Sequence, residues 1–190
     1  MIKKNAALFG LLVALGAFAL SFGVYFQFLA KKDVYLVDNP TPETYYFKIN
    51  AGPQKILSSG QYVEVDLKKG SNRIEVFDSE KKLMYDSMFT VNGVRGLVNI
   101  THSDYYIHRQ YYGYDLKKDS LLSTLGHTMI DGKKYFGGAK KMDKLYTDEF
   151  YFNINEDYDK VVKNIDKVES RVKIFRKQDF LLYYKQYYKF

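Results

Sequence analysis

The stretch Gln61-Tyr-Val-Glu-Val-Asp-Leu67 indicates the fold class, because apolar and polar side chains alternate along it with a period of two. Residues 63, 65 and 67 fall on one face of a strand, and residues 62, 64 and 66 fall on the other. The run Asn72–Asp78 alternates in the same way, and the intervening turn carries Gly70. We therefore expect an antiparallel hairpin within a mainly β fold.

Similar short strands recur about every ten residues on both sides of this hairpin, with turn residues between them. The rhythm predicts an antiparallel β-sandwich over residues 33–112. It resembles the rhythm of immunoglobulin-like (Ig-like) and carboxypeptidase-regulatory-type sandwiches. The expected strands are Val34–Asp38, Thr44–Asn50, Gln54–Ser58, Gln61–Leu67, Asn72–Asp78, Leu83–Val91, Gly96–Thr101 and Tyr105–Tyr112.

A different pattern precedes the strands, since residues 5–30 contain no charged side chain. As a helix this run would be about 39 Å long, enough to cross a bilayer core of about 30 Å. We expect a single-pass transmembrane anchor at 5–30. The alternative is a cleaved signal peptide ending at Ala17-Phe-Ala19. The apolar run continues well past Ala19 to Ala30, which favours the anchor.

Lysine pairs flank the apolar run on both sides, at residues 3–4 and 31–32. The short charged amino terminus favours retention in the cytoplasm, which makes residues 1–4 a cytoplasmic tail. The expected location is a membrane, with the C-terminal domain in the periplasm or extracellular space.

A stripe of small residues lies within an arc of about 80° on the predicted anchor helix. Small side chains let a second helix approach closely, so the stripe is our candidate helix-packing site in the membrane. The alternative is that alanine and glycine are simply frequent in membrane helices. The stripe consists of Ala6, Gly10, Ala14, Ala17 and Ser21.

The chain of 190 residues has a net charge of +7, but the charge is unevenly placed. Residues 33–159 carry 16 basic and 19 acidic side chains, a net of −3, whereas residues 160–190 carry nine and three, a net of +6. An acidic β region argues against nucleic-acid binding. The absence of cysteine excludes disulfides, thiolate metal sites and a cysteine nucleophile.

Residues 113–190 form the expected extension. It includes a short hairpin around Asp131-Gly132, a last strand at Phe150–Ile154, and an amphipathic C-terminal helix from Glu156 to Arg176, capped by Asn155. The helix prediction rests on apolar residues at 161, 162, 165, 168, 172 and 175. Residues 180–190 are rich in aromatics, and periodicity leaves helix and strand open.

Nineteen tyrosines and no tryptophan are the most unusual feature of the composition. Adjacent tyrosines in a strand point to opposite faces, so we expect half of them to be exposed as a protein-interaction surface. The alternative for the tyrosine content is a compositional bias. The alternative for the aromatic residues 180–190 is that they pack on their own domain. The candidate interaction residues are Tyr105, Tyr106, Tyr111, Tyr112, Phe180, Tyr183, Tyr184, Tyr187, Tyr188 and Phe190.

No motif for catalysis or cofactor binding is recognisable. The three histidines, His102, His108 and His127, lack the spacing of a zinc site, and neither a Gly-x-Ser-x-Gly elbow nor a phosphate-binding loop is present. We therefore expect no enzyme activity, no cofactor and no metal.

The sequence points to a membrane-anchored extracytoplasmic protein-interaction domain. We expect an accessory or assembly subunit of a cell-envelope membrane complex, with other membrane or envelope proteins as partners. The alternative is a module that binds cell-wall glycan or peptide through stacked tyrosines.

Overall fold

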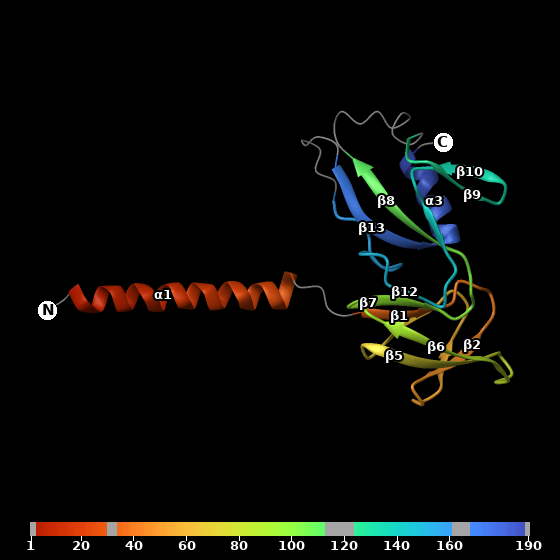
Figure 1. Ribbon diagram of the computed structural model, residues 1–190, viewed down its shortest axis with the longest axis horizontal. Coiled ribbons are helices and arrows are strands. Elements are labelled where there is room, and N and C mark those ends of the chain that lie inside the picture. The colour runs from red at the N-terminus through yellow and green to blue at the C-terminus, as the bar shows by residue number, and fades with distance from the viewer. Residues whose placement is uncertain (1–2, 30–33, 113–123, 161–167, 189–190) are drawn as a thin grey trace. The chain divides into compact units, whose positions relative to one another are not determined.

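The computed structural model describes residues 3–29, 34–112, 124–160 and 168–188, and the chain divides into two compact units, Met1–Asp33 and Val34–Phe190. The first unit is helix α1 (Lys3–Val24) followed by a π-helical turn, η1 (Tyr25–Leu29) (Figure 1). The second unit consists mainly of strands.

Helix α1 and η1 contain residues 5–29 of the predicted apolar segment, and residue 30 lies outside the described part of the chain. The 20 residues Leu8–Gln27 have a mean hydropathy of 2.1, and no residue in the most apolar part of this segment is buried. Among the described residues, this helix alone is long and apolar enough to cross a membrane. Signal sequences near an amino terminus share that length and composition.

Two four-stranded sheets face each other in the second unit. One has the order β12-β7-β1-β4 and the other the order β3-β2-β5-β6. Their bounds are β12 (Tyr146–Thr147), β7 (Arg95–Asn99), β1 (Val34–Asp38), β4 (Tyr62–Val65), β3 (Lys55–Leu57), β2 (Tyr45–Ile49), β5 (Gly70–Phe77) and β6 (Leu83–Val91). Seven of these eight strands were predicted from period-two alternation, and that prediction is confirmed.

The core between the two sheets explains the alternation. Val37 and Val98 of one sheet pack with Phe47, Ile74 and side chains of β3, β4 and β6 in a single apolar cluster. Burying that inner face is the main favourable contribution to folding.

The expectation that every strand pair is antiparallel is wrong at one place. Strand β1 pairs antiparallel with β4 but parallel with β7, where Val34 lies opposite Arg95. Alternation specifies which face of a strand is buried and carries no information about strand direction, so the sequence could not reveal this pair.

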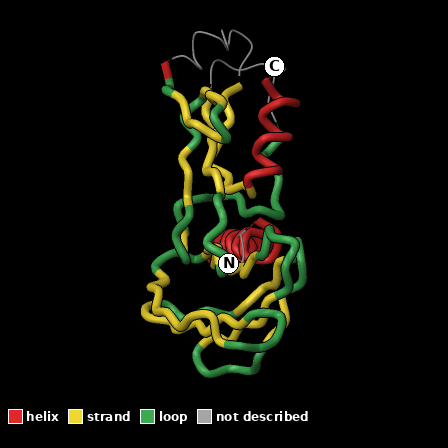
Figure 2. Tube along the Cα trace, turned by 90° about the vertical axis from the view of Figure 1, so that its right-hand side faces the viewer, coloured by secondary structure: helices red, strands yellow, loops and turns green. Residues whose placement is uncertain are grey.

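A third layer is formed by the sheet β11-β8-β13 and helix α3, and it packs on the other face of the sheet that contains β1 and β7. Strand β8 (Tyr105–Tyr112) lies between β11 (Lys140–Met142) and β13 (Val168–Arg176). Helix α3 (Lys177–Tyr188) lies beside these strands, at the upper right of Figure 2. The hairpin β9 (His127–Ile130) and β10 (Lys133–Phe136) has the turn at Asp131-Gly132 that the sequence predicted.

The amphipathic helix expected over 156–176 is wrong. Residues 168–176 form strand β13, residues 156–160 are not helical, and residues 161–167 lie outside the described part of the chain. The apolar spacing was misleading because β13 is buried on both faces: Ile174 packs in one cluster and Phe175 in another. Phe150–Ile154 is not a strand either, since Phe152 makes only an isolated bridge to Lys173.

Candidate functional site

The predicted helix-packing residues lie on α1. The side chains of Gly10, Ala14, Ala17 and Ser21 are exposed, and Ala6 belongs to the same helix. The Ser21 hydroxyl donates a hydrogen bond of 2.8 Å to the Ala17 carbonyl oxygen. Because that hydroxyl is satisfied within the helix, Ser21 is compatible with an apolar surrounding.

Six of the ten predicted interaction residues lie in the core. Tyr105 and Tyr106 are 1% and 2% exposed, so the inference that one of two adjacent tyrosines must be exposed is wrong. Strand β8 is the middle strand of its sheet, and both of its faces are covered. Tyr111, Phe180, Tyr184 and Tyr188 are also buried, Tyr112, Tyr183 and Tyr187 are half-buried, and Phe190 lies outside the described residues.

His108 lies inside this aromatic core and is 1% exposed. The Tyr158 hydroxyl donates to the His108 carbonyl oxygen at 2.7 Å and also lies 3.2 Å from Nδ1. Because the Tyr158 hydroxyl donates its proton to the carbonyl oxygen, its oxygen accepts a hydrogen bond from Nδ1, so Nδ1 is the protonated nitrogen of the ring. The other ring nitrogen, Nε2, accepts from the Tyr188 hydroxyl at 3.2 Å. Burial lowers the pKa of His108 to about 3, so this neutral ring has a structural role.

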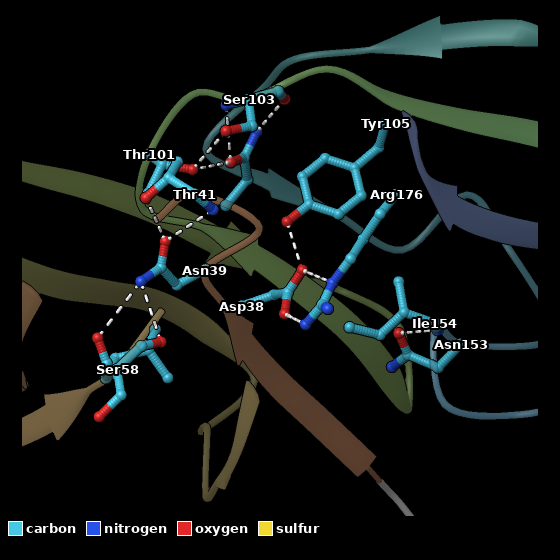
Figure 3. Close-up of polar contacts among 12 residues, drawn as sticks. Asp38, Asn39, Thr41, Ser58, Thr101, Ser103, Tyr105, Asn153, Ile154 and Arg176 are labelled. Carbon is cyan, nitrogen blue, oxygen red and sulfur yellow. Dashed lines mark hydrogen bonds and ion pairs between the residues drawn. The ribbon is translucent and has the colours of Figure 1, made fainter. Parts of the chain in front are cut away.

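A buried ion pair joins the sheet of β1 to the sheet of β8 and β13 (Figure 3). Asp38, at the end of β1, is fully buried and accepts a hydrogen bond of 2.6 Å from the Tyr105 hydroxyl. Arg176 donates to both Asp38 oxygens, through Nε at 2.9 Å and through a second nitrogen. This two-point contact raises the pKa of Arg176 and neutralises the buried carboxylate.

A polar cavity of about 560 Å³ lies next to this ion pair. The Ser103 hydroxyl lies 2.7 Å from the Thr101 hydroxyl, and the His102 ring packs at 5.4 Å against Tyr85. These contacts do not build a nucleophile and base pair. The cavity is lined by Pro40, Thr101, His102, Ser103, Asp104, Arg176, Lys177, Gln178 and Asp179.

No metal centre is formed by the described residues. In that part of the chain, no three histidine, aspartate or glutamate side chains lie close enough together to hold an ion. His127 lies on β9, remote in sequence from His102 and His108, and its ring packs against Phe136 at 6.1 Å.

The outer face of the sheet β3-β2-β5-β6 carries a row of apolar side chains that the sequence analysis missed. In the strand register Ile56 lies opposite Tyr46, Tyr46 opposite Phe77, and Phe77 opposite Leu83. Directly paired residues share a face, so the four side chains form one line across the sheet, the apolar row. Ile56 and Leu83, at its ends, are 54% and 51% exposed.

Cations lie over the two rings at the centre of the apolar row. The Lys48 ammonium is 5.1 Å from the centre of the Phe77 ring, and the Lys81 ammonium is 5.4 Å from that of Tyr46. Both distances are in the range of cation–π contacts. The row therefore combines exposed aliphatic ends with a cationic border.

The neighbouring row on the same face is polar and internally paired. Arg73 Nε donates to Asp86 at 2.8 Å, and its hydrogen bonds lower the pKa of Asp86. Glu75 lies 3.4 Å from Arg73 and 3.9 Å from Lys48. These charges are compensated within the sheet, whereas the aliphatic ends of the apolar row, Ile56 and Leu83, are exposed.

One signal in the sequence marks the apolar row. Apolar residues are adjacent at Tyr46-Phe47, Ile56-Leu57 and Val76-Phe77. In a strand with only one buried face, such neighbours place one apolar side chain outside the core. The inner members, Phe47, Leu57 and Val76, are at most 1% exposed.

Comparisons with known proteins identify no family. No family model matches the chain, and no solved structure matches it. One curated protein, the pre-mRNA-splicing factor ISY1 of Kluyveromyces lactis, is 45% identical over 42 residues. The match covers 22% of this chain and 18% of that protein, so the chain spans under a fifth of the relative's length.

Proposed function

We propose that the chain is a single-pass membrane protein whose extracytoplasmic β unit, a sandwich of Ig-like type, binds another protein. In this role it serves as an accessory or assembly subunit of a cell-envelope membrane complex. The observation that carries the proposal is the apolar row of Ile56, Tyr46, Phe77 and Leu83 on an uncovered sheet face.

The chemistry of the row favours a protein partner. Aromatic side chains at the centre of a patch, with aliphatic neighbours and a charged border, are typical of protein interfaces. The exposed apolar surface of α1 supports a membrane location, because water solvates such a surface poorly. We do not propose the glycan-binding alternative, because rings buried as deeply as Tyr105 and Tyr106 offer no stacking platform.

Affinity capture of the full chain in mild detergent tests this function. The double substitution Ile56→Lys and Leu83→Lys places charges at both ends of the apolar row. We expect it to lower recovery of a specific partner at least about tenfold, since apolar contacts at an interface centre contribute most of the binding energy.

The matched control is Met129→Lys on the hairpin β9–β10. Met129 is 51% exposed, like the row ends, but lies outside the row. Recovery of the partner should be unchanged by this substitution, and all three proteins should have similar thermal midpoints because only exposed side chains change. Equal recovery with the row variant and the control would contradict the proposal.

A further inference from the structure

Strand β6 is a long sheet edge without the usual protection. Within the described structure it pairs with β5 on one side only. A strand edge exposes unpaired backbone groups, and proteins normally keep such edges short, charged or covered. The other edges of the two four-stranded sheets are β3, β4 and β12, with three, four and two residues, whereas β6 has nine.

The other nine-residue edge strand, β13, shows how this chain covers an edge. The backbone of residues 151–152 lies along it: the amides of Tyr151 and Phe152 donate to the Val172 carbonyl oxygen, and the amide of Ile174 donates to the Phe152 carbonyl oxygen. No described segment does the same for β6. Its single charged residue, Asp86, is already paired with Arg73.

The sequence of β6 suits pairing with its own copy. In an antiparallel pair centred on Ser87, Tyr85 of one copy lies opposite Phe89 of the other, and Met84 lies opposite Thr90. Asp86 then faces Met88, so no like charges meet. Tyr85 and Phe89 lie on the inner face and pack in the core of their own copy, so this pairing would join the two cores along that face, and a twofold axis would form each pair twice.

We propose that two copies of the chain associate through β6, antiparallel and centred on Ser87, so that the two sheets β3-β2-β5-β6 become one continuous sheet. The bulge between β5 and β6, after Val76, leaves residues 85–91 of β6 in regular register for this pairing. The inference goes beyond the proposed function, because self-association through the strand edge does not require the apolar row to bind another protein.

Disulfide trapping tests the register, since the chain has no cysteine of its own. Residues opposite each other in an antiparallel pair have Cα atoms about 4.5–5.5 Å apart, within disulfide range. The full-length Ser87→Cys variant in mild detergent should therefore form a covalent dimer on mild oxidation. Non-reducing electrophoresis and intact mass would detect it.

The matched register control is Thr90→Cys on the same strand. Two copies of residue 90 would lie about 20 Å apart, six residues along the strand, so this variant should stay monomeric. A chain that carries both Asp86→Cys and Met88→Cys should cross-link, because these positions face each other in the proposed register and lie within residues 85–91.

Opposite charges at position 88 give a second, reversible test. Met88→Asp would face Asp86 of the other copy twice and should weaken the dimer about tenfold. Met88→Lys would face the same carboxylate and should keep or strengthen it. Met88 is 60% exposed, so both variants should fold, and sedimentation of the full chain in detergent would give the dimer fraction.

The outcomes separate this inference from the proposed function. A monomeric Ser87→Cys variant, or equal dimer fractions for the two Met88 variants, would overturn pairing through β6. Partner recovery that depends on Ile56 and Leu83 would still support the proposed function in that case. Conversely, the self-association alone would be supported if the β6 dimer forms but the Ile56 and Leu83 substitutions do not change the recovery of the partner.

Discussion

Buried polar side chains connect the sheet of β1 to the sheet of β8 and β13 in the β unit. Asp38 and Arg176 are 138 residues apart in sequence, and Tyr105 contributes its hydroxyl to the same carboxylate. Lys173 is buried too; its ammonium donates to the carbonyl oxygens of Asn153 and Glu156, and burial lowers its pKa. A buried charge without such partners is strongly destabilising, so these contacts fix how the layers dock.

His108 should make the stability of the fold depend on pH. Its pKa is about 3 in the folded chain, against an ordinary value of 6.5. Between these values the unfolded chain takes up a proton that the folded chain does not, so the free energy of unfolding falls as the pH falls. This contribution amounts to about 2 kcal/mol between pH 7 and pH 5.

The substitution His108→Gln removes the titrating ring and keeps an amide that can both donate and accept. We expect the pH dependence of the unfolding free energy between pH 7 and pH 5 to shrink by about 2 kcal/mol in urea titrations. His127→Gln, at an exposed position on β9, should keep the wild-type dependence. Equal slopes for the wild type and His108→Gln would contradict the assignment.

At the scale of elements, the alternation is clearest in the strands that have one buried face, although β1 and β7, which are buried on both faces, were also predicted. In β5, Ile74 and Val76 are fully buried while Phe77 lies on the outer face, so a period of two is visible. In β13 both faces are buried, by Ile174 on one side and Phe175 on the other, and the alternation disappears. Strand β8 is also buried on both faces, and for this reason the sequence did not reveal that its tyrosines are buried.

The candidate sites also differ in how far the sequence alone marks them. The adjacent apolar pairs of the apolar row can be read from the sequence, but its continuity across four strands depends on register, which only the folded sheet provides. The contact between Asp38 and Arg176 depends on long-range packing, and no local pattern of residues marks it.

Helix α3 should be essential to the stability of the β unit. Phe180 is fully buried, and its ring stacks on Tyr106 of β8 at 5.3 Å. Truncating a fully buried aromatic side chain costs about 3–5 kcal/mol. We expect Phe180→Ala to lower the free energy of unfolding by that amount in urea titrations.

Leu182 provides the control for this prediction. It lies on the same helix but is 57% exposed, so Leu182→Ala should change stability by no more than about 0.5 kcal/mol. A similar effect of both substitutions would mean that α3 docks elsewhere. A truncation after Lys177 should likewise lower the thermal midpoint by many degrees, because it removes Tyr184 and Tyr188 from the same core.

At the scale of the whole molecule, the chain joins an exposed apolar helix to a β unit with its own cores. The 20 residues Leu8–Gln27 would span about 30 Å as a helix, the thickness of a bilayer core. The described part of the β unit contains three apolar clusters. The proposed functions of membrane attachment and partner binding therefore fall on different units of the chain.

We expect the apolar amino-terminal segment to be retained in the mature protein. The apolar run continues for eleven residues beyond Ala19, where a signal peptide would be cleaved, and α1 with η1 continues through that position without a break. Mass spectrometry of the membrane-extracted protein should therefore find the amino-terminal peptide that begins at Met1. The variant Ala19→Leu, which would block cleavage after a small residue, should leave the mass unchanged except for the substitution itself. A mature chain that begins at Leu20 in the wild type, and a longer chain in Ala19→Leu, would instead identify residues 1–19 as a signal peptide and remove the basis for a membrane-anchored function.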